Sequence, residues 1–266
     1  MLKSVCVAAV MCAAASAWAQ AAPAPAIVLF GEVHDNAAQH ALRLAEFKAL
    51  LAPGARPALL MEQFDRERQP EIDRVRAASP RPDADAVILA GSGALASDTR
   101  AWNWAFYKPL IELALANQLP IVAANVSRAD TRRVVGEGLA AAGFDADVPP
   151  AIVRAQADII ERSHCGQVDA PLATRMASAQ IARDQFMARL IAANAARGVW
   201  LLAGNGHVRS DIGVPHWLPP ALRERTQAIG SLEEGDDGVD RAAYDRVVVT
   251  PAQTREEPCA AFSKKN

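Results

Sequence analysis

Five short apolar runs alternate along this chain with longer segments whose hydrophobic residues recur at helical spacing. The runs occupy residues 26–30, 58–62, 120–124, 199–203 and 245–249. Their hydrophobicity is continuous rather than alternating, which is typical of strands covered on both faces. The pattern therefore predicts a three-layer α/β/α fold, in which a mainly parallel central sheet lies between two layers of helices.

The segment 127–197 contains helical patterns without a convincing strand. Its clearest helix begins after Asp169, a good N-cap residue, and Gly198 is a natural stop. We expect a helical insertion that packs over the ligand-binding edge of the sheet. The segment 78–100 is rich in Ser, Asp, Gly and Pro, and we expect it to form an irregular loop.

The first residues have the features of a secretory signal peptide. Lys3 precedes a short apolar run, and Ala17 and Ala19 are the small residues that a signal peptidase recognises. We predict that cleavage after Ala19 removes residues 1–19, which leaves 20–266 as a single domain in the periplasm. Neither cysteine of the signal segment follows a small residue, so a lipid anchor is disfavoured.

Charge and cysteine content narrow the possibilities further. The formal net charge is −2, and no cluster of Lys and Arg occurs, which argues against nucleic acid as a partner. Two cysteines lie outside the signal segment, Cys165 and Cys259. In an oxidising compartment such an even pair favours a disulfide, and we predict that these two cysteines form one.

Polar residues end or follow four of the predicted strands. They are Glu32 and His34, Glu62, Asn125, and His207. Because the loops at the carboxyl ends of parallel strands converge on one crevice, we expect these side chains to meet at one site. Both histidines would then lie at the edge of the sheet, so replacing either one with alanine is expected to leave stability nearly unchanged.

Carboxylates and imidazoles at one edge can bind a divalent metal, act as general acid and base, or hold the polar groups of a cofactor. Their spacing alone does not choose among these roles. In a metal-dependent hydrolase the metal ligands or acid–base groups would be Glu32, His34, Glu62 and His207. Alternatively, the carboxylates form ion pairs and the histidines are structural. The chain has no Gly-x-Ser-x-Gly nucleophile elbow.

Seven short motifs follow one another along the chain. They occupy residues 28–36, 59–64, 104–110, 121–128, 163–166, 180–184 and 202–209. Their order and spacing resemble the ChaN family of haem-binding, iron-uptake-associated proteins, which lies in the wider Tiki, TraB and erythromycin-esterase-like superfamily. The resemblance covers nearly all of the chain after the signal segment.

The resemblance implies a protein of haem and iron uptake or storage that binds haem b in a pocket shared between two protomers of a homodimer. An outer-membrane haem-uptake receptor is an implied partner. No Cys-x-x-Cys-His motif occurs, so the haem is expected to be bound non-covalently. The wider superfamily includes metal-dependent hydrolases, so a peptidase or esterase with a divalent metal ion is the alternative.

For a haem iron, the possible donors are His, Tyr, Cys and Met. Tyr107 lies in the aromatic cluster 102–107, whose rings could flank a porphyrin, and phenolate favours ferric iron. Tyr107 is therefore the predicted iron donor. The same cluster could equally be ordinary core at the start of a helix.

Other residues are candidates for haem contacts. Besides His34, Asn125 and His207, the arginines that could pair with the propionates are Arg128, Arg132 and Arg183. We expect His164 to be held near the disulfide. His40 and His216 have no supporting partners in the sequence, and we expect them to be packing or surface residues.

Overall fold

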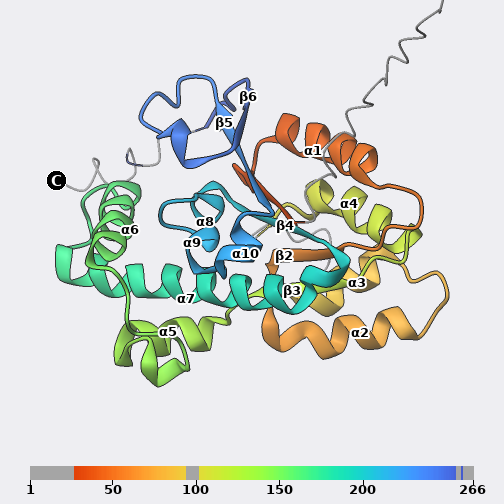
Figure 1. Ribbon diagram of the computed structural model, residues 1–266, viewed down its shortest axis with the longest axis horizontal. Coiled ribbons are helices and arrows are strands. Elements are labelled where there is room, and N and C mark those ends of the chain that lie inside the picture. Colours follow the sequence, from red (N-terminus) through yellow and green to blue (C-terminus); the bar gives the residue numbers. More distant parts are fainter. Residues whose placement is uncertain (1–26, 94–101, 256–258, 260–266) are drawn as a thin grey trace, which may run out of the picture.

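Six parallel strands form one central sheet in the computed structural model, which describes residues 27–93, 102–255 and 259 (Figure 1). The strands are β1 (Ile27–Glu32), β2 (Ala58–Asp65), β3 (Ile121–Asn125), β4 (Val199–Gly204), β5 (Thr226–Glu233) and β6 (Arg246–Thr250). Their order across the sheet is β3-β2-β4-β1-β5-β6. The predicted signal peptide lies outside the described residues.

Helices cover both faces of this sheet, which confirms the three-layer prediction. In β1, Val28 and Phe30 pack into the core on one face, and Ile27 and Leu29 pack into the core on the other. Successive side chains of a strand point to opposite faces. A strand buried on both sides therefore reads as a continuous apolar run, and this is the reason that the five predicted strands were recognisable.

Strand β5 was not predicted, because Gly230 and Ser231 interrupt its apolar pattern. Both residues are nevertheless buried in the sheet. A Cβ atom on Gly230 would lie 2.8 Å from the ring of Tyr244, so the close approach of that ring requires glycine here. The strand forms because its neighbours β1 and β6 pair with it on either side.

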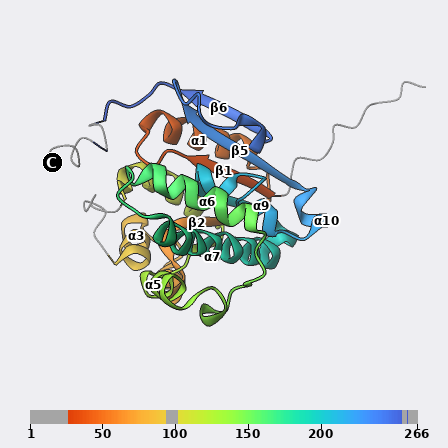
Figure 2. The same ribbon diagram turned by 90° about the vertical axis from the view of Figure 1, so that its left-hand side faces the viewer.

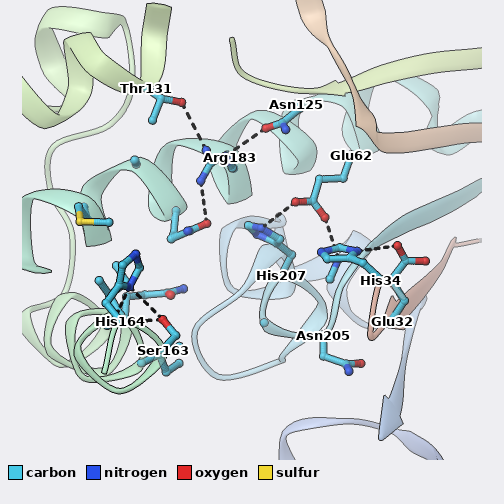
Figure 3. Close-up of a pocket in the computed structure, with 18 of the residues that line it drawn as sticks. Glu32, His34, Glu62, Asn125, Thr131, Ser163, His164, Arg183, Asn205 and His207 are labelled. Carbon is cyan, nitrogen blue, oxygen red and sulfur yellow. Dashed lines mark hydrogen bonds and ion pairs between the residues drawn. The ribbon is translucent and has the colours of Figure 1, made fainter. Parts of the chain in front are cut away.

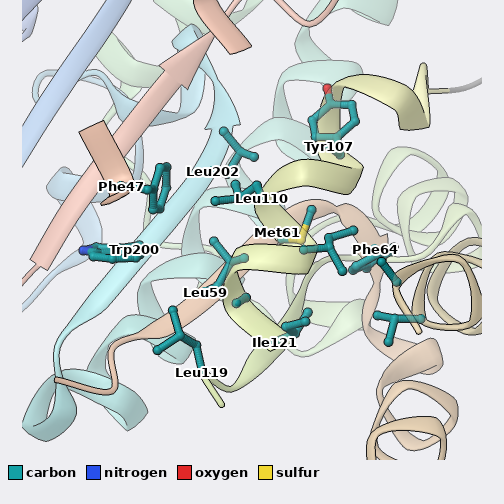
Figure 4. Packing of buried hydrophobic residues seen from close by; sticks show 14 of the residues in the cluster. Phe47, Leu59, Met61, Phe64, Tyr107, Leu110, Leu119, Ile121, Trp200 and Leu202 are labelled. Atoms are coloured by element: carbon teal, nitrogen blue, oxygen red, sulfur yellow. The ribbon is translucent and has the colours of Figure 1, made fainter. Parts of the chain in front are cut away.

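One face of the sheet carries the larger core cluster, in which Phe47 and Phe64 pack with Leu59 and Met61 of β2 (Figure 4). Trp104 belongs to the same cluster. The helices on this face are α1 (Ala37–Leu50), α2 (Gln69–Ala77), α3 (Ala84–Ser92) and α4 (Trp104–Ala116).

The prediction of an irregular loop at 78–100 is wrong for the central part of this segment, which forms helix α3. Val87 and Ile88 on this helix are fully buried. Their burial against the sheet stabilises a helix in a segment whose composition favours turns. Residues 94–100 lie outside the described part of the chain.

The other face is covered mainly by the long helix α7. The helices on this side are α5 (Arg128–Glu137), α6 (Pro150–Ser163), α7 (Ala170–Asn194), α8 (Asn205–Val208), α9 (Val214–Trp217) and α10 (Pro220–Arg223). Short 3-10 turns occur at Arg66–Arg68, Ala140–Ala142, Ala195–Arg197 and Arg241–Ala243. None of the helices in the described ranges is both long enough and apolar enough to cross a membrane.

Helix α7 has two roles along its length. Its N-cap Asp169 accepts a hydrogen bond from the backbone N of Leu172 at 2.8 Å, as predicted. The C-terminal half packs Met187 and Ile191 against the sheet. The N-terminal half lies side by side with α6 (Figure 2). Together α5, α6 and this half of α7 form the predicted helical insertion at the ligand-binding edge.

The predicted disulfide is present between Cys165 and Cys259, whose Cα atoms lie 5.6 Å apart. It joins the turn between α6 and α7 to the C-terminal tail across a sequence separation of 94 residues. A cross-link over so long a loop restricts the unfolded chain strongly.

We expect the double variant Cys165→Ser/Cys259→Ser to have a free energy of unfolding about 2–4 kcal/mol lower than that of the oxidised parent. Urea unfolding of both proteins measures this difference. The parent treated with reductant serves as the control and should unfold like the double variant. Equal midpoints for the oxidised parent and the double variant would contradict the prediction.

Candidate functional site

A cavity of about 700 Å³ opens where the carboxyl ends of β1, β2, β3 and β4 face helices α6 and α7 (Figure 3). This volume lies within the range of about 300–1,000 Å³ that is usual for ligand and cofactor sites. All five of the predicted strand-end residues line it: Glu32, His34, Glu62, Asn125 and His207. The predicted convergence of these side chains is therefore observed.

Glu32 is a buried carboxylate with four partners. Its Oε1 accepts hydrogen bonds from Nδ1 of His34 at 2.7 Å, from the hydroxyl of Tyr107 at 2.7 Å and from Nε2 of Gln63 at 3.2 Å. Its Oε2 forms an ion pair with Nη1 of Arg43 at 2.7 Å. Burial alone would raise the pKa of Glu32, but the Arg43 guanidinium and the His34 hydrogen bond hold it below its usual value.

His34 is oriented by this carboxylate. Because Glu32 only accepts, Nδ1 of His34 carries a proton. Burial would lower the pKa of His34, but the hydrogen bond to Glu32 and the charge of Glu62 raise it. A Cβ atom on Gly204 would lie 3.2 Å from Nε2 of His34, so the glycine leaves room for the ring. The side chain of His34 is 43% exposed, and its ring makes a T-shaped contact with the ring of Trp102.

His207 is held between two carboxylates. Its Nδ1 lies 2.6 Å from Oδ1 of Asp184, and its Nε2 lies 3.5 Å from Oε1 of Glu62. Burial would lower the pKa of His207, but Asp184 and Glu62 raise it to about 10. Burial alone would raise the pKa of Glu62, whereas the His207 cation lowers it to about 2. His207 is therefore an imidazolium whose two nitrogens both face carboxylates.

These pairings bear on the expected role of His207. The residue is only 9% exposed and neutralises buried charge, so we now expect its replacement to lower stability, unlike that of a residue at the edge of the sheet. Both of its nitrogens lie beside carboxylates. Within the described ranges, no group of three or more His, Cys, Asp or Glu residues is arranged to hold a metal ion.

Sequence reasoning missed two charged residues that support the site, Asp184 and Arg43. Asp184 is fully buried, and burial raises the pKa of its carboxyl to about 6. It occupies a position on the apolar side of α7, between Ile181 and Ala188. Arg43 lies on the buried side of α1, four residues before Phe47. A charged residue within the apolar stripe of a helix is the signal that could have identified both.

Arg183 supplies a cation to the pocket. It donates from Nε to Oδ1 of Asn125 at 3.1 Å, from Nη1 to Oε1 of Gln180 at 3.0 Å and from Nη2 to Oγ1 of Thr131 at 3.5 Å. All three acceptors are neutral, and no described carboxylate forms an ion pair with Arg183. Of the three arginines predicted as propionate partners, Arg183 lines the pocket, whereas Arg128 and Arg132 are on α5 and do not.

Tyr107 does not line this pocket. Its side chain is buried in the core (Figure 4), its ring lies 5.8 Å from that of Trp104, and its hydroxyl donates to Glu32. Burial and the neighbouring carboxylate raise the pKa of the Tyr107 phenol well above its usual value. This geometry does not support Tyr107 as an iron donor. Of the aromatic cluster 102–107, Trp102 lines the cavity.

The wall opposite the strand ends comes from the helical insertion. Its apolar members are Val135, Ile159, Ile160, Met176 and Ala179. His164, expected only to lie near the disulfide, is a further lining residue at the end of α6. The pocket is therefore amphipathic, with a charged edge at the strands and an apolar helical wall.

The two histidines that were expected to be packing or surface residues, His40 and His216, lie away from the cavity. His40 is buried, contacts the backbone carbonyl of His34 through Nε2 at 3.0 Å and stacks on Phe106. His216 lies beside Trp217 on α9. Neither lines the cavity, which agrees with the expectation that they are packing or surface residues.

Comparison with known proteins identifies related sequences and folds. A family model described as "Haem-binding uptake, Tiki superfamily, ChaN" matches residues 18–218. The solved structure of ChaN of Campylobacter jejuni, described for its cofacial haem binding, is similar with a TM-score of 0.67. The two chains are 18% identical, over 84% of this chain and 86% of that one.

More distant similarities are found among other solved structures. The type III effector HopBA1 has a TM-score of 0.46 and 13% identity, over 85% of this chain and 88% of that chain. A mutant of the erythromycin esterase EreC in its open conformation has a TM-score of 0.44 and 14% identity, over 79% and 71%. A search of curated protein sequences finds no match.

Proposed function

The chain belongs to the ChaN family of haem-binding uptake proteins in the Tiki superfamily, and we propose that it binds haem b non-covalently in the pocket at the strand ends. Haem has an apolar ring and two propionate carboxylates, so it needs an apolar wall beside a cation. The observation that carries the proposal is Arg183, a pocket cation whose described hydrogen-bond acceptors are all neutral, on the helix that also contributes Met176 to the apolar wall.

The residues at the charged edge would hold the propionates. Arg183 can donate two parallel hydrogen bonds to a carboxylate, the geometry in which guanidinium groups bind carboxylates best. Asn125, which already orients Arg183, lies at the same edge. His34 and the His207 imidazolium add further donors and positive charge. The bound haem would supply an iron centre, and these side chains would bind and orient it.

The proposal extends to location and partners. The signal-peptide pattern supports export to the periplasm, with cleavage after Ala19 and no lipid anchor. Haem would be exchanged there with an outer-membrane haem-uptake receptor. Because His34 is 43% exposed, one side of the site is accessible to a second copy of the chain, and we include a homodimer with a shared haem pocket. Sedimentation velocity with and without haemin tests the dimer.

A second candidate function is hydrolysis of a peptide or ester. The observation that favours it is the Glu32–His34 pair, in which a buried carboxylate orients an imidazole as in general-base catalysis. Turnover of chromogenic esters and peptides, measured with and without added divalent metal ions, tests this candidate. Activity that is lost in His34→Ala while haemin leaves the visible spectrum unshifted would favour it over haem binding.

Titration with haemin tests the main proposal, and we expect a saturable, shifted Soret band. The variant Arg183→Gln is expected to bind haemin about ten- to a hundredfold more weakly, because a charge-assisted hydrogen bond contributes about 1.5–3 kcal/mol. The matched control is Arg128→Gln, which removes an arginine outside the pocket and should bind like the parent. Equal weakening in both variants would contradict the assignment.

A further inference from the structure

The pocket offers few side chains that can donate to iron. The lining residues of a suitable type are His34, His164, Met176 and His207. His207 is excluded because both of its nitrogens face carboxylates. His34 lies at the charged edge, bonded to Glu32 through Nδ1 and with Nε2 beside the backbone of Gly204. An iron at His34 would bring the apolar ring of haem against buried carboxylates.

His164 is in a different environment. Its Nδ1 lies 2.8 Å from the backbone carbonyl of Ile160, which can only accept, so Nδ1 carries the proton. When the ring is neutral, the lone pair is then on Nε2. Metal-binding histidines commonly show this arrangement, in which one ring nitrogen donates to a carbonyl and the other binds the metal. No described carboxylate forms an ion pair with His164.

The position of His164 suits the apolar part of a haem. It lies on the helical wall with Ile159, Ile160 and Met176, apart from His34 and His207 (Figure 3). Its neighbour Cys165 is tied to the C-terminal tail by the disulfide, which limits movement of this turn. A haem with propionates at Arg183 would have its apolar ring on this wall.

From this geometry we propose that His164 is the residue that donates to the haem iron, through Nε2. The proposal rests on haem binding in this pocket and deepens it, because it assigns the iron to the turn at the end of α6 and the propionates to Arg183 on α7. His164 is exposed, and among the described residues its side chain hydrogen-bonds to Ser163 and Ile160 of its own turn, so its replacement should spare the fold.

Absorption and electron paramagnetic resonance spectra of the ferric haemin complex, recorded on the oxidised protein, test the proposal. We expect His164→Ala to shift the Soret band and to weaken haemin binding at least about tenfold, the loss that follows removal of even a residue supporting a metal ligand. Added imidazole should restore the parent spectrum in this variant. His164→Gln should behave in the same way and guards against a folding defect specific to alanine.

One control and one competing variant define the outcomes. His216→Ala removes a histidine outside the pocket and should leave the spectrum unchanged. Met176→Leu removes the thioether sulfur, the other possible donor on the helical wall, and loss of the parent spectrum in this variant but in neither His164 variant would assign the iron to Met176 instead. If the parent binds haemin and both His164 variants keep its spectrum, the iron donor is another residue and haem binding stands. If the parent gives no shifted Soret band, the proposed function fails as well.

Discussion

Replacing His207 with alanine is expected to lower the free energy of unfolding at pH 7 by about 3–5 kcal/mol, because it leaves Asp184 and Glu62 buried without their cation. Denaturant unfolding measures this loss. The matched variant His34→Ala should lose only about 1 kcal/mol, since Glu32 keeps its ion pair with Arg43. Similar losses in the two variants would contradict the charge assignment.

The pH dependence gives a second check on the same cluster. The pKa of His207 is raised to about 10, so its stabilising contribution is complete below its ordinary pKa of 6.5 and is lost as the pH rises through 10. The pKa of Glu62 is lowered to about 2, so its contribution is present above 4.5 and is lost as the pH falls through 2. Asp184, with a pKa raised to about 6, acts oppositely and disfavours the fold as the pH rises from 3.8 through 6.

In His207→Ala the imidazolium is absent, so protonation of Asp184 and Glu62 removes their buried charges and stabilises the folded variant. The difference in the free energy of unfolding between the parent and His207→Ala should therefore be largest between about pH 7 and 9. It should narrow in acid, where the variant protonates Asp184 and Glu62, and again above pH 10, where the parent loses its cation. A difference that stays constant with pH would mean that His207 contributes packing rather than charge. Adding Asp184→Asn to His207→Ala should recover part of the loss.

Arg43→Met is expected to lower the free energy of unfolding by about 3–5 kcal/mol, because it leaves Glu32 as an uncompensated buried charge. Methionine preserves much of the length of the side chain, so the cavity created is small. The side chains of Arg43 and Glu32 are 4% and 0% exposed. Tyr107, Gln63 and His34 would still donate hydrogen bonds to Glu32, but none can replace a permanent positive charge.

A surface ion pair provides the control for this second prediction. Arg246 pairs with Glu46 where the two side chains are 42% and 27% exposed, and such pairs contribute about 0–1 kcal/mol. Arg246→Met should therefore be nearly neutral. Adding Glu32→Gln to Arg43→Met should restore part of the lost stability, since the buried charge is then removed. A loss in Arg43→Met no larger than that in Arg246→Met would show that Glu32 is not charged in the folded protein.

Local patterns in the sequence were sufficient for most of the framework. Residues 26–30 and 199–203 were predicted as buried strands because their apolar character is continuous, and Asp169 has the chemistry of an N-cap. The parallel sheet then brings the residues after its strands to one edge. This is the reason that the strand-end residues could be expected at one site from the amino-acid sequence: Glu32, His34, Glu62, Asn125 and His207.

Where a polar side chain points, and which partner it meets, depended on packing between distant segments. Arg183 and Arg128 are both helical arginines near the site, yet only Arg183 faces the cavity. Tyr107 meets Glu32, a residue 75 positions away in the chain, and so turns from the pocket into the core.

The sequence by itself determined the layers, the strands with continuous apolar runs, the edge at which the site lies and the pair of cysteines. Each of these follows from local periodicity, composition or the geometry of parallel strands. Only the tertiary structure decided that β5 joins the sheet, that Asp184 holds His207 and that His164 faces the cavity. These features depend on contacts between residues far apart in the chain. A local sequence pattern does not predict which of those contacts form, because their free energies depend on the packing of distant segments.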